Sequence, residues 1–212
     1  MSMDLSSLKM QYPSEALARI AAELTAQYQG TFSQETVERY VLESHAALQR
    51  TAKIQRYLVQ LTEKFVKDRL LALAQAQDSS LKTRPEVLFV CVQNSGRSQM
   101  AMAFLEELSE GKIGVRSAGS MPADQLSDKT MLAMQEVGID LGSQFPKPLT
   151  DDVVQAADVV ITMGCGDACP IYPGKKYLDW NLPDPSLLDM EGVRAVRDQI
   201  KAKVQQLVEE LV

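Results

Sequence analysis

The hydrophobic periodicity of this chain changes near residue 85, and that change limits the possible folds more than any other feature of the sequence. Residues 13–77 place apolar side chains three and four positions apart, which is the spacing of amphipathic helices. From residue 86 onward, short β-branched runs alternate with helical stretches, which is typical of a doubly wound α/β sheet. We therefore predict two domains, an N-terminal three-helix bundle at residues 1–83 and an α/β domain at residues 84–212.

Three helices with short connections are expected in the first domain. The first runs to about Gln29, where Gly30 is expected to end it. Thr31 followed by Gln34 is typical of a capping box and predicts the start of the second helix. The third helix carries an apolar stripe made of Ile54, Leu58, Leu61, Phe65, Leu70 and Leu73. This stripe is either the core of the bundle or a subunit interface, and both uses are compatible because so small a bundle has little core of its own.

Four strands and four helices are expected in the second domain. The predicted strands are Val87–Val90, Ile113–Arg116, Val159–Thr162 and Lys176–Trp180. The predicted helices are Met100–Leu108, Gln125–Val137, Asp151–Ala157 and Gly192–Val212.

Composition and charge exclude several classes of function. The formal charge is −6, and no Lys- or Arg-rich run interrupts the acidity, so nucleic acid is not expected as a partner. The longest apolar run, at residues 87–92, is far too short to cross a membrane. The first residues show no secretory signal, so we expect a cytoplasmic protein whose three cysteines stay reduced.

The loop at residues 91–98, Cys-Val-Gln-Asn-Ser-Gly-Arg-Ser, lies between a predicted buried strand and a predicted helix. Ligands of parallel sheets bind at this position, and the N–H groups of a loop that enters a helix form an anion site. Arg97 can donate to two oxygens of a tetrahedral anion, and its charge favours a thiolate nucleophile at Cys91. We therefore predict that Cys91 is catalytic and that the oxyanion is bound by Val92, Gln93, Asn94, Ser95, Gly96, Arg97 and Ser98.

This loop resembles the active-site loop of the low-molecular-weight tyrosine phosphatase superfamily. The resemblance implies a four-stranded parallel sheet with helices on both faces. A second feature of the superfamily is a downstream Asp-Pro pair, which Asp184 and Pro185 match. The resemblance implies that Asp184 donates a proton to the leaving oxygen, whereas without it the pair would be interpreted as a simple turn.

Cys165 and Cys169 follow the third predicted strand and should lie at the same edge of the sheet as Cys91. Three thiols at one edge indicate a redox relay, and arsenate has the shape and charge of phosphate. Cys91 would attack arsenate, Cys165 would then attack Cys91 and release arsenite, and Cys169 would carry the disulfide outward. A zinc site is the alternative, but it needs about four ligands and the single histidine, His45, lies in the helical domain. No metal and no cofactor are therefore expected.

The second domain is also similar to the thioredoxin-coupled arsenate reductases of this superfamily. That similarity implies arsenate as substrate, with phosphate or sulfate as mimics, and thioredoxin as reductant. The N-terminal helices resemble an extra domain of actinobacterial members, which implies a homodimer formed through these helices. Met102 stands where some members have a potassium-binding glutamate, and Ser186 stands where tyrosine phosphatases have an aromatic residue.

Three alternatives stay open at this point. The chain could be a tyrosine phosphatase that needs only Cys91, Arg97 and Asp184. It could reduce arsenate with a small thiol, which would leave Cys165 and Cys169 dispensable. It could also be a non-enzymatic phosphate-binding module.

Overall fold

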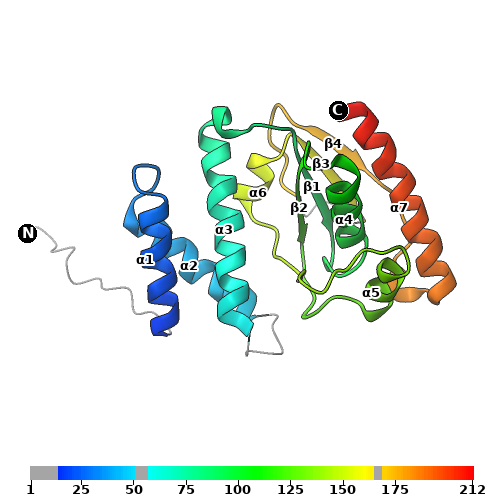
Figure 1. Cartoon of the computed structure of the whole chain (residues 1–212), viewed down its shortest axis with the longest axis horizontal. Helices are drawn as coiled ribbons and strands as arrows, with labels where there is room; N and C mark the ends of the chain where they lie inside the picture. Colours follow the sequence, from blue (N-terminus) through cyan, green and yellow to red (C-terminus); the bar gives the residue numbers. More distant parts are fainter. Residues whose placement is uncertain (1–13, 51–56, 165–168) are drawn as a thin grey trace, which may run out of the picture. The chain divides into compact units, whose positions relative to one another are not determined.

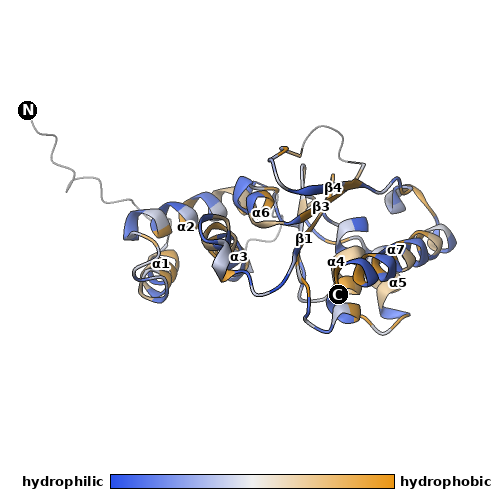
Figure 2. Ribbon diagram, turned by 90° about the horizontal axis from the view of Figure 1, so that it is seen from above, coloured by the Kyte–Doolittle hydropathy of each residue, from blue (hydrophilic) through white to orange (hydrophobic). Residues whose placement is uncertain are grey.

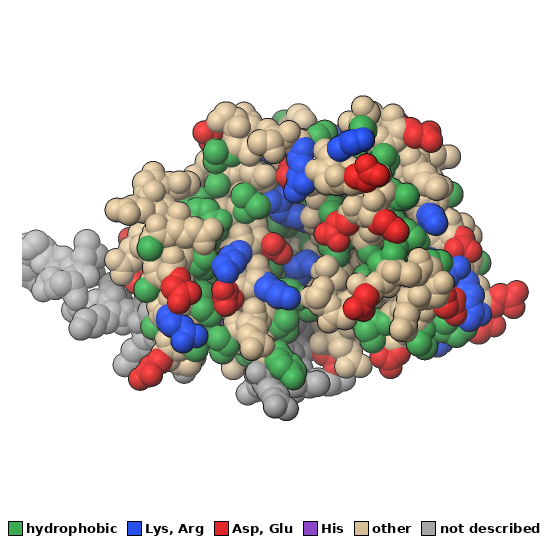
Figure 3. Space-filling model, viewed as in Figure 1, with side chains coloured by type: hydrophobic (Ala, Val, Ile, Leu, Met, Phe, Trp, Pro, Cys, Tyr) green, Lys and Arg blue, Asp and Glu red, His purple; other side chains and the backbone are tan. Residues whose placement is uncertain are grey.

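The computed structural model describes residues 14–50, 57–164 and 169–212, which fall into two compact units. The first unit holds the N-terminal helices as far as Leu70, and the second holds the rest of the chain to Val212. Acidic and basic side chains are interspersed over the face seen in Figure 3. Among the described helices, none combines the length and the apolar character that a membrane span requires.

The first unit is helical, as predicted. Its elements are α1 (Glu15–Gln27), α2 (Gln34–Gln49) and the first part of α3 (Leu58–Gln77). The capping-box prediction at Thr31 is wrong, because Ser33 caps α2 with a side chain that accepts from the backbone N–H of Thr36. Arg69 joins α3 to α2, since its guanidinium donates to the Ser44 hydroxyl at 3.0 Å and covers the ring of Tyr40.

The second unit contains the four-stranded parallel sheet that the sequence predicts. The strands lie in the order β2-β1-β3-β4, and all three pairings are parallel (Figure 1). Their bounds are β1 Glu86–Cys91, β2 Gly114–Gly119, β3 Val159–Met163 and β4 Lys176–Asp179. The order reverses beside β1, so the carboxyl end of β1 is the point where this fold class places ligands.

Side chains of β1 alternate between two apolar cores. Val87, Phe89 and Cys91 face a core built with α4, α5 and α7, whereas Leu88 and Val90 face a smaller core that includes α6. Figure 2 shows α4, α5 and α7 on one side of the strands and α6 on the other. The bounds of these helices are α4 Arg97–Ser109, α5 Asp128–Gln135, α6 Asp151–Ala156 and α7 Met190–Leu211.

Three of these helices start at different residues from those predicted. α7 starts at Met190 rather than at Gly192, because Asp189 caps it by accepting from the backbone N–H of Gly192. α4 starts at Arg97 rather than at Met100, and its first turn of polar side chains is buried. α5 starts at Asp128 rather than at Gln125, because Ser127 caps it by accepting from the backbone N–H of Thr130. Apolar periodicity did not locate the starts of α4 and α5, because the first turn of each of these two helices is polar.

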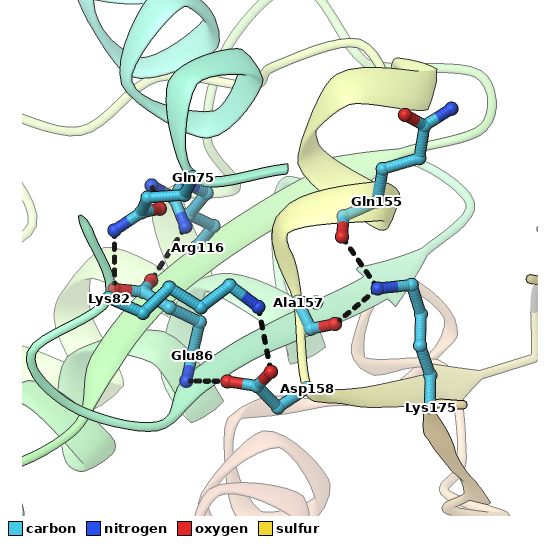
Figure 4. Close-up of polar contacts among 8 residues, drawn as sticks. All are labelled: Gln75, Lys82, Glu86, Arg116, Gln155, Ala157, Asp158 and Lys175. Carbon is cyan, nitrogen blue, oxygen red and sulfur yellow. Dashed lines mark hydrogen bonds and ion pairs between the residues drawn. The ribbon is translucent and has the colours of Figure 1, made fainter. Parts of the chain in front are cut away.

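A partly buried polar network lies at the start of β1 and just before β3 (Figure 4). Glu86 of β1 accepts from Arg116 of β2 at 2.6 Å and from the side-chain amide of Gln75 at 3.1 Å. Asp158, just before β3, accepts from the backbone N–H of Glu86 and from Lys82. These contacts fix the start of β1 relative to β2 and β3.

Candidate functional site

Cys91 is the last residue of β1, at the carboxyl edge of the sheet. It pairs with Gly119 of β2 on one side and with Met163 of β3 on the other. Its side chain is a free thiol and only 3% exposed. The parallel pairing on both sides fixes where the loop at residues 91–98 begins.

The carbonyl groups of this loop point outward. The carbonyl oxygens of Cys91, Val92, Gln93 and Ser95 accept from the backbone N–H groups of residues 120, 121, 123 and 127, at 2.8–3.2 Å. The carbonyl of Asn94 accepts from the Gln99 side chain at 3.1 Å. The C=O and N–H of one peptide group point in opposite directions within its plane. A loop whose carbonyls point outward therefore turns its N–H groups inward.

The inward N–H groups form an anion nest. In the described part of the chain, the backbone N–H groups of Ser95, Gly96, Arg97 and Ser98 donate to no carbonyl or side chain. These four residues lead into the first turn of α4, where the helix dipole adds positive potential. A small anion bound here would receive several hydrogen bonds without any movement of the backbone.

Two donors surround the sulfur of Cys91. The backbone N–H of Asn94 donates to Sγ at 3.2 Å, and the Ser98 hydroxyl lies 2.9 Å from Sγ. The side-chain amide of Asn94 donates to the Ser98 oxygen at 2.8 Å, which leaves the Ser98 proton free to be donated to the sulfur. These contacts fix the position of the sulfur at the start of the loop.

Asn94 holds the loop in shape. Its φ of +48° lies in the left-handed region, which asparagine tolerates better than most residues. The side chain is fully buried, and its oxygen accepts from the backbone N–H of Lys147 at 2.8 Å and from Gln99 at 3.0 Å. A single residue therefore supports the loop, the start of α4 and the segment at Lys147.

Arg97 and Asp184 meet at the mouth of the loop. Nη2 of Arg97 lies 3.1 Å from Oδ2 of Asp184, and Nη1 donates to the carbonyl of Leu182 at 3.1 Å. A side-chain carbon at Gly164 would lie 3.1 Å from Nη1, so the glycine at the end of β3 leaves room for the guanidinium. These groups border a solvent-open pocket lined by Cys91, Gln93, Ser95, Gly96, Arg97, Ser127, Thr130, Asp184, Pro185 and Ser186.

Two family models match the chain. Residues 17–74 match the protein-tyrosine-phosphatase-like, N-terminal domain, and residues 86–212 match the low molecular weight phosphotyrosine protein phosphatase family. The chain belongs to the low molecular weight phosphotyrosine protein phosphatase family. The domain boundary between residues 83 and 84 stays a prediction. The first match ends before this boundary, and the second begins after it.

Several relatives of this phosphatase-family chain carry the name arsenate reductase. A solved structure of the Corynebacterium glutamicum thioredoxin-dependent arsenate reductase is 46% identical, covers 93% of this chain and 96% of its own, and has a TM-score of 0.83. The glutaredoxin arsenate reductase of Synechocystis is 38% identical over 58% of this chain and 95% of its own length. Arsenate reductase 1 of Staphylococcus epidermidis is 35% identical over 56% of this chain and 92% of its own.

The charge state of Asp184 decides whether this residue can donate a proton. Burial alone would raise the pKa of Asp184, but hydrogen bonds from the backbone N–H and hydroxyl of Ser186 and the charge of Arg97 outweigh it. The pKa is therefore lowered from 3.8, and the carboxylate is ionised at neutral pH. In this anion-free state, Asp184 is paired with Arg97 and is not ready to donate a proton.

The structure brings together most of the residues singled out in the sequence. One pocket is lined by Cys91, Gln93, Ser95, Gly96, Arg97 and Asp184, whereas Val92, Asn94 and Ser98 are not among its lining residues. Cys169 is buried beyond the end of β3, and its Sγ lies 3.9 Å from the carbonyl oxygen of Pro170. Cys165 lies outside the described residues. In the described ranges, no group of three or more metal-ligating side chains is close enough to hold an ion.

Sequence reasoning missed the contribution of α5 to the pocket. Ser127 and Thr130 line it, and the backbone N–H of Ser127 donates to the carbonyl of Ser95 at 3.0 Å. The sequence contained one signal, a serine followed by aspartate at the true start of α5, which is typical of a capped helix N-terminus. That signal shows where the helix begins but not that this end touches the loop.

Proposed function

We propose that this protein is an arsenate reductase that forms a covalent adduct with arsenate through Cys91. The similarity to the Corynebacterium glutamicum thioredoxin-dependent arsenate reductase carries this proposal, because it extends over 93% of the chain and includes the helical unit. The pocket suits this chemistry, since it combines inward N–H groups, a guanidinium and a buried thiol that receives hydrogen bonds.

Cys91 begins the reaction as a thiolate. Arsenate enters the nest, and its oxygens take hydrogen bonds from the loop N–H groups and from Arg97. The bound anion competes with Asp184 for Arg97, and its negative charge favours the protonated carboxyl. Cys91 Sγ then bonds to arsenic as one arsenic–oxygen bond breaks, and Asp184 supplies the proton with which that oxygen leaves as water.

Cys165 and Cys169 complete the reduction in this proposal. The Cys165 thiolate attacks Cys91 Sγ, and the electron pair of the sulfur–arsenic bond reduces arsenic from the +5 to the +3 state. Arsenite leaves, and a Cys91–Cys165 disulfide remains. Cys169 attacks Cys165, which frees the Cys91 thiolate and forms a Cys165–Cys169 disulfide. A dithiol protein such as thioredoxin then reduces that disulfide.

Phosphatase activity is the second candidate, since the chain belongs to a phosphatase family. That chemistry needs Cys91, Arg97 and Asp184 but neither of the other cysteines. The residue after the Asp-Pro pair favours the reductase. Ser186 has no aromatic ring on which an aryl phosphate could stack, and its hydroxyl donates to Asp184 at 2.8 Å.

Two predictions from the sequence belong to this proposal, a cytoplasmic location and a homodimer formed through the N-terminal helices. A groove between α1 and α2, lined partly by Ala18, Ala22 and Ala26, offers small side chains against which a second helix could pack. Light scattering measures the molar mass of wild type and of Ala22→Glu. Wild type should have the mass of a dimer and Ala22→Glu that of a monomer, and a monomer mass for both proteins would contradict the homodimer.

The test of the proposed reaction is a coupled assay with thioredoxin, thioredoxin reductase and NADPH. Wild type should consume NADPH only when arsenate is added, and Cys91→Ser, Cys165→Ser and Cys169→Ser should each stop multiple turnover. Replacing thioredoxin with glutaredoxin and glutathione identifies the reductant, because a Synechocystis relative is named for glutaredoxin.

Arsenite release without any reductant separates the roles of the thiols. Cys169→Ser should release about one arsenite per chain, since a Cys91–Cys165 disulfide can still form, whereas Cys165→Ser should release none. Hydrolysis of para-nitrophenyl phosphate by wild type, without arsenate-dependent NADPH loss, would establish the phosphatase instead.

A further inference from the structure

A buried hydroxyl without a partner lies at the wall of the oxyanion pocket. Thr130 is 0% exposed, and its Oγ1 makes no hydrogen bond within the described part of the chain. It lines the same pocket as Cys91, Arg97 and Asp184. A side-chain carbon built on Gly96 would lie 3.4 Å from Oγ1, so the hydroxyl faces the segment where the loop enters α4.

Two other threonines of the described helices bond their hydroxyls within the helix. Thr25 and Thr62 each donate to the carbonyl of the residue four positions earlier in their helix, both at 2.7 Å. Thr130 is the third residue of α5, where the residue four positions earlier precedes the helix. A buried hydroxyl that makes no hydrogen bond costs free energy of folding. Such a hydroxyl at the wall of a pocket therefore calls for a ligand that accepts its proton when bound.

Two hydrogen bonds hold the backbone of Thr130 against the loop. The Ser127 side chain caps α5 by accepting from the backbone N–H of Thr130 at 3.4 Å. The backbone N–H of Ser127 donates to the carbonyl of Ser95, which ties the same helix end to the loop. The position of the Thr130 backbone relative to the nest is therefore fixed before any anion arrives.

We propose that Thr130 is an oxyanion-binding residue whose hydroxyl donates a hydrogen bond to an oxygen of the bound anion. The inference rests on the proposed function, in that the anion is arsenate or its mimic phosphate. An anion oxygen only accepts, and the Thr130 proton has no competing acceptor among the described residues. The bond is strengthened by the charge of the anion and by the exclusion of water from a fully buried side chain.

Phosphate binding to the full-length protein, measured by calorimetry, tests this assignment. Thr130→Val removes the hydroxyl and should weaken phosphate binding about tenfold or more, which is the usual effect of losing one hydrogen bond to a charged group. Thr130→Ser keeps the hydroxyl and should recover most of the affinity. Thr130→Ala replaces the valine variant if valine does not fit, because alanine removes the hydroxyl without adding bulk.

Ser109→Ala is the matched control. Ser109 ends α4, is 1% exposed and also has a hydroxyl without a partner, but it does not line the pocket. Its removal should leave phosphate affinity unchanged. Neither Ser109→Ala nor Thr130→Val should lower the melting temperature, because each removes an unsatisfied buried group.

The outcomes separate this inference from the proposed function. If wild type binds phosphate and Thr130→Val and Thr130→Ala bind it equally well, the Thr130 assignment is wrong while the oxyanion site stands. If Thr130→Val binds weakly only because its melting temperature falls, and Thr130→Ala binds normally, the assignment is also wrong. If wild type binds neither phosphate nor arsenate, the proposed function itself fails.

Discussion

The Ser98 hydroxyl should support Cys91 as the nucleophile, and Ser98→Ala tests this directly. The hydroxyl lies 2.9 Å from Sγ, and its oxygen also accepts from the Asn94 amide. Hydrogen bonds to charged groups contribute roughly 1.5–3 kcal/mol. Since 1.36 kcal/mol corresponds to a factor of ten in rate, loss of this hydrogen bond should slow the reaction of Cys91 by about ten- to a hundredfold.

The measurement is the rate of Cys91 alkylation by iodoacetamide at neutral pH. Cys165→Ser and Cys169→Ser serve as the background, so that Cys91 is the one thiol that reacts. The rate should fall in Ser98→Ala and stay unchanged in Ser109→Ala, which lies at the other end of α4. Ser98→Ala should also lose about 1–3 kcal/mol of stability, because the buried Asn94 amide loses an acceptor.

An unchanged alkylation rate in a folded Ser98→Ala protein would refute this reasoning. In that case the backbone N–H of Asn94, which donates to Sγ at 3.2 Å, and the helix dipole would be sufficient to support the nucleophile. Circular dichroism establishes that the variant is folded.

Three further predictions concern charge. Arg97→Lys should lower turnover at least about a hundredfold with little effect on stability, because lysine cannot make the two-pronged contact; steady-state kinetics and a melting curve check this, and near-normal turnover would contradict it. Glu86→Gln should destabilise the second unit by about 3–5 kcal/mol, because it leaves the charge of Arg116 without its buried partner, and denaturant unfolding measures the loss. Burial lowers the pKa of His45 below 6.5, so its contribution to stability is complete above pH 6.5 and is lost as pH falls through the lowered folded value. His45→Gln should remove that acid-side loss, and identical unfolding profiles of the two proteins between pH 7 and about pH 5 would exclude it.

The order of elements was predictable because each strand and helix of the second unit has its own apolar period. The positions of Cys91 and Arg97 at one pocket were also predictable, since loops after parallel strands meet at the carboxyl edge of the sheet. The first turns of α4 and α5 were not, because Ser98 and Thr130 are polar side chains buried by tertiary contacts rather than by an apolar face.

The parts of the site that escaped prediction all depend on contacts between distant segments. The loop carbonyls bond to residues 120–127, and Asn94 bonds to Lys147, which stands 53 positions away. No local pattern marks such pairs. Within the loop, the Asn94 amide donates to Ser98 and the Ser95 hydroxyl donates to Gln93.

The outward carbonyls of the loop have a consequence for amide hydrogen exchange. A rigid buried backbone normally exchanges slowly because its N–H groups are bonded within the protein. Here the carbonyls of residues 91–96 are bonded while the N–H groups of residues 95–98 have no acceptor in the described chain. Without an anion these four amides should exchange quickly although the segment does not move. An anion in the nest should slow their exchange, and it should leave the exchange of the amides of residues 120, 121 and 123 unchanged. Exchange at this loop would therefore report occupancy of the site rather than flexibility of the chain.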